Sequence, residues 1–238
     1  MSETMLDVRV WRGGDAGAFQ TFAVPRRANQ TVLDVVFWIQ RHRDPTLAFR
    51  YACRVGMCGS CAMTVNGRPR WTCRTHVARV TNAGRLTVAP LRNLPVIKDL
   101  AADLAPFFAK WTKAEGRFMP KAGLGPDFAV VPPESRERRA ADAGIECIGC
   151  AVCYAACDVV AWNPDYLGPA ALNRAWTLVN DIRDGSPTRL KSVAGDAGCH
   201  ACHGQEGCRR HCPKHLDPTG SIAGLKRASA LAALKGEL

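Results

Sequence analysis

The chain has 238 residues, of which 47% are hydrophobic and 22% charged, and this balance excludes a disordered chain. The formal net charge is +11, but the basic residues are spread out and form no continuous stripe, which argues against a nucleic-acid-binding protein. Its apolar stretches are far shorter than a membrane span, and its first residues lack the pattern of a signal peptide. We therefore expect a soluble protein that stays inside the cell.

The first hundred residues have the pattern of a small mixed α/β unit. Residues 6–11 and 19–24 alternate enough between apolar and polar side chains to form a strand pair. Thr31 can cap a helix with one apolar face that ends near residue 41. Residues 61–73 contain an Asn-Gly turn typical of a hairpin, and residues 85–90 form a further short strand. This order predicts a small mixed sheet packed on one helix.

The composition changes in the second half of the chain. Residues 99–111 are expected to form a helix, and residues 116–133 are rich in Gly and Pro without periodicity. From residue 134 onward almost nothing resembles a strand, and the last twenty residues have a helical composition. We therefore predict a boundary near residue 105, with α/β structure before it and helices after it.

Twelve cysteines in a chain without an export signal require an explanation. Disulfides are not expected in a reducing compartment, so metal binding or redox chemistry is the better interpretation. Cysteine-free stretches separate three groups, whereas buried structural cysteines would be scattered. The groups are Cys53, Cys58, Cys61 and Cys73; Cys147, Cys150, Cys153 and Cys157; and Cys199, Cys202, Cys208 and Cys212.

The first group has the C-x4-C-x2-C spacing of plant-type ferredoxins, with a fourth cysteine further on. Such a loop must wrap a cluster with its amide groups turned inward, and Gly56 and Gly59 give the backbone that freedom. A zinc ribbon is the alternative, but zinc ribbons usually pair two C-x2-C knuckles and only one is present. We therefore predict four ligands for a [2Fe–2S] cluster: Cys53, Cys58, Cys61 and Cys73.

The second group has the C-x2-C-x2-C-x3-C spacing of bacterial ferredoxins, in which the fourth cysteine binds the other cluster of a pair. The third group repeats this frame with Gln205 at the second cysteine position. A run that lacks one cysteine can hold only three irons through cysteine. The predicted ligands are Cys147, Cys150, Cys153 and Cys212 for a [4Fe–4S] cluster, and Cys157, Cys202 and Cys208 for a [3Fe–4S] cluster.

A pair of [4Fe–4S] clusters is the competing interpretation of these two runs. It requires a ligand other than cysteine, or a bent loop that brings in Cys199. Outside the frame, Cys199 is most simply a buried or free thiol.

Four segments together resemble the iron–sulfur subunit of succinate dehydrogenase and fumarate reductase: "YACRVGMCGSCAMTVNG", "CIGCAVCYAAC", "WNPDYLGPAA" and "CRRHCPKHLDP". The resemblance covers nearly the whole chain. It implies an α+β fold, with a β-grasp plant-type ferredoxin domain over residues 1–105 and an all-α, bacterial-ferredoxin-like domain over residues 106–238.

The resemblance also implies a function. The flavoprotein partner of this family interconverts succinate and fumarate at a covalent FAD, and the iron–sulfur subunit carries single electrons through [2Fe–2S], [4Fe–4S] and [3Fe–4S] clusters to a quinone. One or more membrane-anchor subunits complete the quinone site. A peripheral position on the cytoplasmic face of the inner (plasma) membrane, held by the partner subunits, is implied as well.

Three residues match the quinone-side positions of the family: Trp162, His203 and Lys226. Their indole, imidazole and ammonium groups can each hydrogen-bond or stabilise a reduced quinone oxygen. The chain departs from the family at Asp158, where a proline is usual. A carboxylate there would lower the reduction potential of a nearby cluster, or would simply cap the following turn.

Two other functions remain open from the sequence. The chain could serve a different flavoprotein dehydrogenase as its iron–sulfur module. It could also be a zinc-structured, basic nucleic-acid-binding protein, which would be colourless and contain about one zinc per four cysteines.

Overall fold

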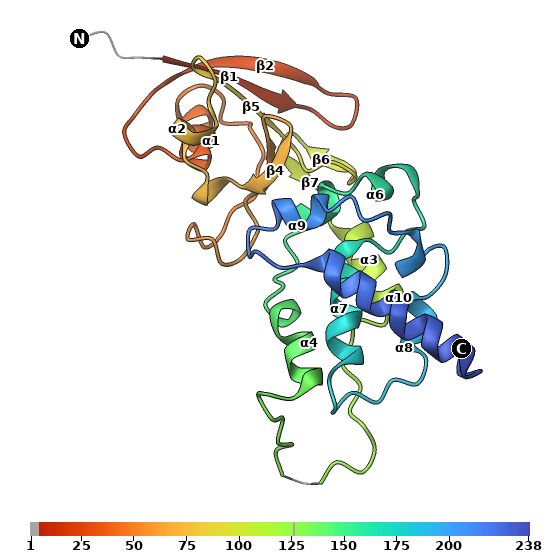
Figure 1. Cartoon of the computed structure of the whole chain (residues 1–238). Helices are drawn as coiled ribbons and strands as arrows, with labels where there is room; N and C mark the ends of the chain where they lie inside the picture. Colours follow the sequence, from red (N-terminus) through yellow and green to blue (C-terminus); the bar gives the residue numbers. More distant parts are fainter. Residues whose placement is uncertain (1–4, 126) are drawn as a thin grey trace. The chain divides into compact units, whose positions relative to one another are not determined.

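The computed structural model describes residues 5–125 and 127–238 and packs into two compact units (Figure 1). The first unit combines Met1–Leu104 with Ile148–Ala156, and the second combines Ala105–Cys147 with Cys157–Leu238. The segment Ile148–Ala156 carries part of the second cysteine group, so this group is divided between the units. The two continuous domains expected from the sequence stay a prediction, because packing alone does not show which segments fold independently.

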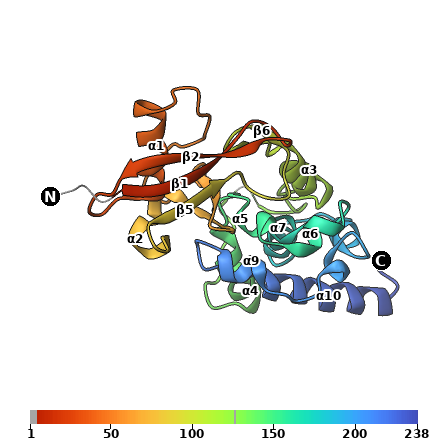
Figure 2. The ribbon, with the colours of Figure 1, turned by 90° about the horizontal axis from the view of Figure 1, so that it is seen from above.

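A five-stranded mixed sheet forms the centre of the first unit. Its strand order is β2-β1-β5-β3-β4, and Figure 2 shows β1 between β2 and β5. The β1–β5 pair is parallel, whereas the β1–β2, β3–β5 and β3–β4 pairs are antiparallel. The predicted strands and the Asn-Gly hairpin are confirmed, with Asn66 and Gly67 both at positive φ as a tight turn requires. The strands are β1 (Met5–Arg12), β2 (Ala18–Pro25), β3 (Ala62–Val65), β4 (Arg68–Trp71) and β5 (Arg85–Ala89).

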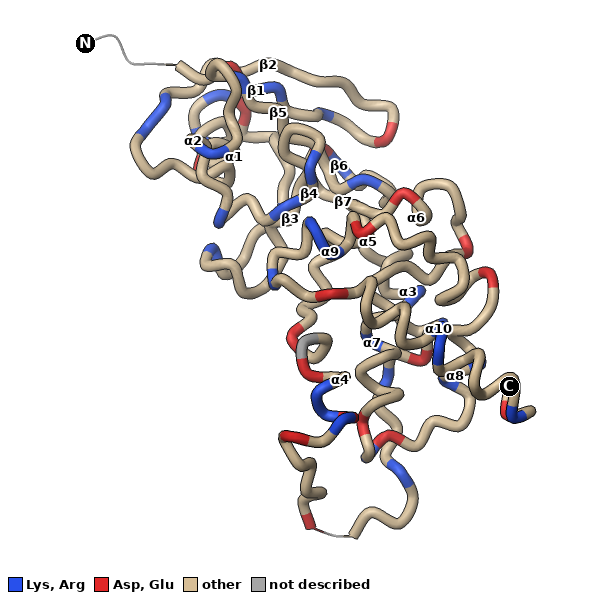
Figure 3. The backbone as a smooth tube through the Cα atoms, viewed as in Figure 1, with Lys and Arg blue, Asp and Glu red and all other residues tan. Residues whose placement is uncertain are grey.

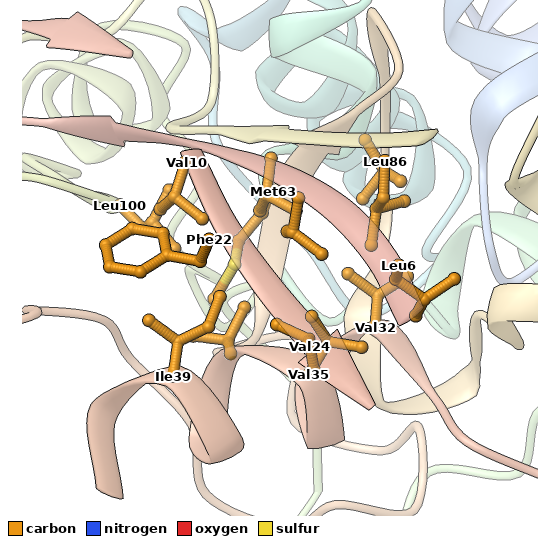
Figure 4. Close-up of a cluster of buried hydrophobic side chains, with 14 of the residues drawn as sticks. Leu6, Val10, Phe22, Val24, Val32, Val35, Ile39, Met63, Leu86 and Leu100 are labelled. Atoms are coloured by element: carbon orange, nitrogen blue, oxygen red, sulfur yellow. The ribbon is translucent and has the colours of Figure 1, made fainter. Parts of the chain in front are cut away.

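Helix α1 (Val32–His42) packs its apolar face on this sheet. Thr31 and Asp34 form a capping box, because each side chain accepts a hydrogen bond from the backbone N–H of the other residue. Figure 4 shows side chains from α1 and the strands pointing toward one another in the core. The labelled residues of this core are Leu6, Val10, Phe22, Val24, Val32, Val35, Ile39, Met63, Leu86 and Leu100.

The helix expected over residues 99–111 begins six residues late. Asp99 is buried at φ 54°, and its carboxylate accepts hydrogen bonds from the backbone N–H groups of Gly13 and Ala48, at 2.7 and 2.8 Å, and from the Arg12 guanidinium. These bonds to distant segments fix Asp99 outside a helix. The short elements of this unit are η1 (Thr72–Arg74), α2 (Val77–Val80), β6 (Val96–Lys98), β7 (Ala101–Ala102) and α5 (Val152–Ala155).

The second unit is built from helices, and within its described residues there is no strand longer than the isolated Pro120–Asp184 bridge. Figure 1 shows α7 between α4 and α10, and both neighbours pack against it. The predicted helix at the C-terminal end is confirmed as α10. The elements are α3 (Ala105–Lys113), α4 (Arg136–Ile145), α6 (Asp158–Trp162), α7 (Pro169–Val179), α8 (Arg189–Val193), η2 (Cys199–Ala201), α9 (Gly207–His211) and α10 (Pro218–Leu234).

Close packing and hydrogen bonds join these helices. A Cβ atom on Gly224 of α10 would lie 2.6 Å from the Trp176 ring of α7, so only glycine permits this approach. The Trp176 Nε1 donates to the Ala140 carbonyl of α4 at 2.9 Å, and the Ser221 hydroxyl of α10 donates to Asn173 at 2.8 Å. The helices therefore form a well-defined framework for the loops that carry cysteines.

Candidate metal centres

The loop from Cys53 to Cys58 turns backbone N–H groups toward sulfur. The amides of Met57 and Cys58 donate to Cys53 Sγ at 3.3 Å, and the Cys53 amide donates to Cys58 Sγ at 3.4 Å. Hydrogen bonds from the Val55 and Met57 backbone lower the pKa of Cys53 to about 6. The loop is thus built to stabilise thiolate, the form in which cysteine binds metal.

Gly56 and Gly59 both have positive φ, at 76° and 74°, as expected for a loop that wraps a cluster. Cys61 and Cys73 are buried next to each other at the end of the β3–β4 hairpin. Burial, with the neighbouring Cys61, raises the pKa of Cys73 to about 12. Two adjacent buried thiols can both ionise only if a positive centre compensates their charge, so this donor set fits a metal cluster.

The segment of the second cysteine group that belongs to the first unit packs directly beside this site. Val152 is fully buried in one apolar cluster with Cys61 and Cys73. A Cβ atom on Gly59 would lie 2.4 Å from the Cβ of Cys150, so the two loops touch at this point. The first unit therefore brings the predicted [2Fe–2S] ligands next to a predicted [4Fe–4S] ligand.

The second and third cysteine groups share one backbone conformation. Gly149 and Gly204, each directly before the second position of its run, have φ of 64° and 70°. Ala151 and Glu206, each directly after it, have φ of 60° and 58°. Left-handed backbone is rare for residues with a side chain, so its repetition at matching positions shows that both runs form the same kind of loop. Gln205 occupies the place that Cys150 has in the other loop.

The two loops also continue alike. Each leads into a short helix that carries the third cysteine, α5 in one run and α9 in the other. Each run then ends in an extended residue, Cys157 with ψ 119° and Cys212 with ψ 116°. This similarity supports the alignment of the two runs, in which Gln205 stands at the second cysteine position. The assignment of each ligand stays a prediction.

Three thiols of the second unit gather around the buried hydroxyl of Tyr166. Cys157, Cys202 and Cys208 all lie close enough to this residue to raise its pKa, after the larger effect of burial. Burial also raises the pKa of Cys157, and that of Cys208 to about 11. These three residues are the predicted [3Fe–4S] ligands. Tyr166 itself was missed in the sequence analysis, although it lies in the quoted segment "WNPDYLGPAA".

The three predicted quinone-side residues lie near Cys202. The Trp162 side chain is exposed, and its ring meets that of His203 edge to face with centroids 6.2 Å apart. The Lys226 ammonium donates a hydrogen bond to the Cys202 carbonyl at 2.7 Å. The structure therefore brings all three residues to the loop that carries one predicted [3Fe–4S] ligand.

The structure also shows the surroundings of Cys199 and Asp158, for which the sequence suggested alternative roles. Cys199 is fully buried, with its sulfur 3.8 Å from the Ser229 hydroxyl of α10. Asp158 is exposed and is the first residue of α6, whose N-cap is Cys157. The expectation that Asp158 caps this turn is therefore wrong, because the residue lies one position too late.

The described residues contain neither a compact group of ligands for one metal ion nor a membrane-spanning helix. No three His, Cys, Asp or Glu side chains there lie close enough together to hold a single metal ion. Within residues 5–125 and 127–238, no helix combines the length and apolar character needed to cross a bilayer.

Comparison with known proteins supports an iron–sulfur protein. Residues 7–109 match the family model of a 2Fe-2S iron-sulfur cluster binding domain, and residues 146–217 match that of a 4Fe-4S dicluster domain. These matches do not support the zinc-structured alternative.

Two curated relatives carry related names. The fumarate reductase iron-sulfur subunit of Mycobacterium tuberculosis is 38% identical over 92% of this chain and 89% of its own length. The mitochondrial succinate dehydrogenase [ubiquinone] iron-sulfur subunit 1 of Oryza sativa subsp. japonica is 36% identical over 82% of this chain and 70% of its own length.

A solved structure has the same fold. A chain of the Mycobacterium smegmatis Sdh1 complex in the apo form superposes with a TM-score of 0.88 at 28% identity, covering 96% of this chain and 97% of that one. The chain belongs to the iron–sulfur subunits of succinate dehydrogenase and fumarate reductase.

Proposed function

We propose that the chain conducts electrons between the FAD of a flavoprotein subunit and a membrane quinone, in a complex that interconverts succinate and fumarate. On this proposal the first unit contains a β-grasp plant-type ferredoxin fold and the second a helical fold of the bacterial ferredoxin type. One or more membrane-anchor subunits hold the complex at the cytoplasmic face of the inner membrane.

Three clusters supply the redox chemistry when bound, each accepting and releasing one electron at a time. We assign Cys53, Cys58, Cys61 and Cys73 to [2Fe–2S]; Cys147, Cys150, Cys153 and Cys212 to [4Fe–4S]; and Cys157, Cys202 and Cys208 to [3Fe–4S]. The chain itself contributes thiolates, inward amide groups and apolar surroundings. Trp162, His203 and Lys226 are proposed to hydrogen-bond or stabilise the quinone oxygens.

The observation that carries this proposal is the contact between the first two cysteine loops. A Cβ atom on Gly59 would lie 2.4 Å from that of Cys150, and Val152 is buried beside Cys61 and Cys73. Such close packing has no obvious use for two independent structural metal sites. It suits two redox centres that exchange electrons.

Co-purification tests the proposal. The chain is tagged, expressed together with the proposed flavoprotein and membrane-anchor subunits, and isolated in detergent. We expect a complex that contains covalently bound FAD and reduces a quinone with electrons from succinate. A tagged chain that instead isolates a flavoprotein without succinate or fumarate activity would favour the module of a different dehydrogenase.

A further inference from the structure

A basic pocket opens beside the first cysteine loop, and its lining contains no cysteine. Its volume is about 320 Å³. It lies within the first unit, along α1 and the residues just before this helix, and the loop that begins at Cys53 closes one side. The arginines Arg27, Arg41 and Arg54 line it, together with the rings of Phe37 and Trp38. We call this feature the arginine pocket.

The three guanidinium groups of the arginine pocket are available to a ligand. None of them forms an ion pair with a carboxylate in the part of the chain that the structure describes. Asp34 is the acidic residue of the lining, and its carboxylate already accepts two hydrogen bonds from Thr31. The pocket therefore has an excess of positive charge.

Phe37 holds two of these groups in place. The guanidinium carbons of Arg41 and Arg54 lie 5.2 and 5.5 Å from the centre of its ring. A ring face orients a guanidinium but satisfies few of its N–H donors, so the donors remain free to bind oxygen atoms. A guanidinium group is planar and presents several N–H donors side by side. It can therefore bind a carboxylate through two parallel hydrogen bonds.

The surroundings of the pocket are those of a protein interface. Arg54 directly follows Cys53, and the same loop exposes Val55 and Met57, which are 60% and 63% accessible. Tyr51 is also exposed beside Phe37, with ring centroids 4.6 Å apart. Exposed apolar and aromatic side chains next to arginines are typical of protein–protein interfaces.

We propose that the arginine pocket binds carboxylate side chains of the flavoprotein subunit and so fixes that subunit over the loop from Cys53 to Cys58. The inference rests on the proposed function, since it requires a flavoprotein that exchanges electrons with this loop. Covering the exposed loop excludes water from Cys53 and Cys58, and the adjacent charge contacts fix the orientation of the partner.

The test measures binding of the isolated flavoprotein subunit to the full-length, cluster-loaded chain. Arg27→Glu and Arg41→Glu reverse charges inside the pocket, whereas Arg26→Glu and Arg79→Glu reverse charges at exposed positions of the same unit that do not line it. Removing one partner of a desolvated charge pair weakens binding by roughly 30-fold or more. We expect this loss for the two pocket variants and a change of no more than about threefold for the controls, as for exposed charges.

The electron paramagnetic resonance (EPR) signal of the reduced [2Fe–2S] cluster verifies that each variant is folded around its cluster. If Arg41→Glu loses that signal, Arg41→Gln replaces it, because glutamine is polar and removes the positive charge without adding a negative one. Equal losses in pocket and control variants would overturn the proposal, since they would indicate a general effect of net charge. Unchanged binding in the pocket variants would overturn it too, and would leave the proposed function intact.

A second arm distinguishes a small anion from a protein partner. The full-length chain is titrated with sodium succinate and with inorganic phosphate. Saturable binding that Arg41→Glu abolishes, combined with unchanged flavoprotein binding, would assign the pocket to a small anion and overturn the proposal. Failure of the unmodified chain to bind the flavoprotein at all would overturn the proposed function and the pocket's role together.

Discussion

Tyr166 places a buried hydroxyl group among the three cysteines of the proposed [3Fe–4S] site. The hydroxyl lies close to all three thiols, so it can donate a hydrogen bond to a sulfur ligand. Reduction adds negative charge to a cluster, and hydrogen bonds to its sulfur atoms stabilise that charge. Tyr166 should therefore favour the reduced state of this cluster.

Replacing the tyrosine by phenylalanine tests this effect. Tyr166→Phe keeps the ring and removes the hydroxyl, so we expect a lower midpoint potential for the three-iron EPR signal in a redox titration. Tyr51→Phe is the control, because Tyr51 is exposed and lies in the first unit. An unchanged potential in Tyr166→Phe would show that the hydroxyl does not act on the cluster.

On the proposed assignment, Gln205 limits the third cysteine group to three irons. Its loop has the backbone of the loop around Cys150, so a cysteine there would be placed as a fourth ligand. We expect Gln205→Cys to replace the three-iron signal by that of a reduced [4Fe–4S] cluster, with more iron per chain. Gln205→Asn should keep three irons, and a Gln205→Cys variant that also keeps three would show that the frame is misassigned.

At the scale of elements, the contact between two cysteine loops depends on the absence of one side chain. Gly59→Ala would place a methyl group 2.4 Å from the Cβ of Cys150 at a φ of 74°, which L-residues rarely adopt. The left-handed backbone alone costs about 1–2 kcal/mol, and the clash must displace one loop. We expect loss of the [2Fe–2S] EPR signal or a marked change in its shape.

Gly67→Ala is a matched control for this change. Gly67 also has positive φ, but a Cβ atom there would meet nothing within 4 Å. Gly67→Ala should therefore lower the stability of the first unit without altering the [2Fe–2S] EPR signal. Equal effects of both variants on the signal would mean that the approach to Cys150 is unimportant.

Buried Arg189 at the start of α8 joins two loops, because it forms an ion pair with Asp184 between α7 and α8 and hydrogen bonds with the segment between α3 and α4. Arg189 and Asp184 are almost fully buried, with the Arg189 Nη2 2.6 Å from the Asp184 carboxylate. Arg189 also donates hydrogen bonds to the carbonyls of Glu115 and Arg117. Arg189→Met should destabilise the second unit by about 3–5 kcal/mol, because Asp184 is left buried without a counter-charge.

The Arg183–Asp181 pair provides the comparison, because the Arg183 side chain is 41% accessible. Arg183→Met should cost no more than about 1 kcal/mol, as is usual for exposed pairs. Urea unfolding followed by circular dichroism measures both variants. If both variants lost similar amounts of unfolding free energy, the importance assigned to the buried pair would be contradicted.

The sequence predicted those elements whose signals are local. Thr31 caps α1 and the Asn66–Gly67 turn joins β3 to β4, because both depend on residues close together in the chain. The start of α3 was missed, since Asp99 is fixed by distant residues such as Gly13. The cysteine groups were visible by spacing, whereas Tyr166 and the arginine pocket were not, because only folding brings their partners together.

For the whole molecule, positive charge is distributed rather than concentrated. Figure 3 shows Lys and Arg along the chain in both units, with acidic residues among them. The net charge of +11 therefore says little about one particular partner, and the arginine pocket is informative because its guanidinium groups lack acidic partners in the described chain.

On our proposal this one chain holds three different clusters, with a three-iron site where Gln205 replaces cysteine. Low-temperature EPR of the full-length chain, first oxidised and then reduced stepwise, distinguishes these clusters. We expect a three-iron signal in the oxidised sample and a [2Fe–2S] signal on mild reduction. An oxidised sample without a three-iron signal would contradict the assignment at Gln205 and, with it, the proposed ligands of the second unit.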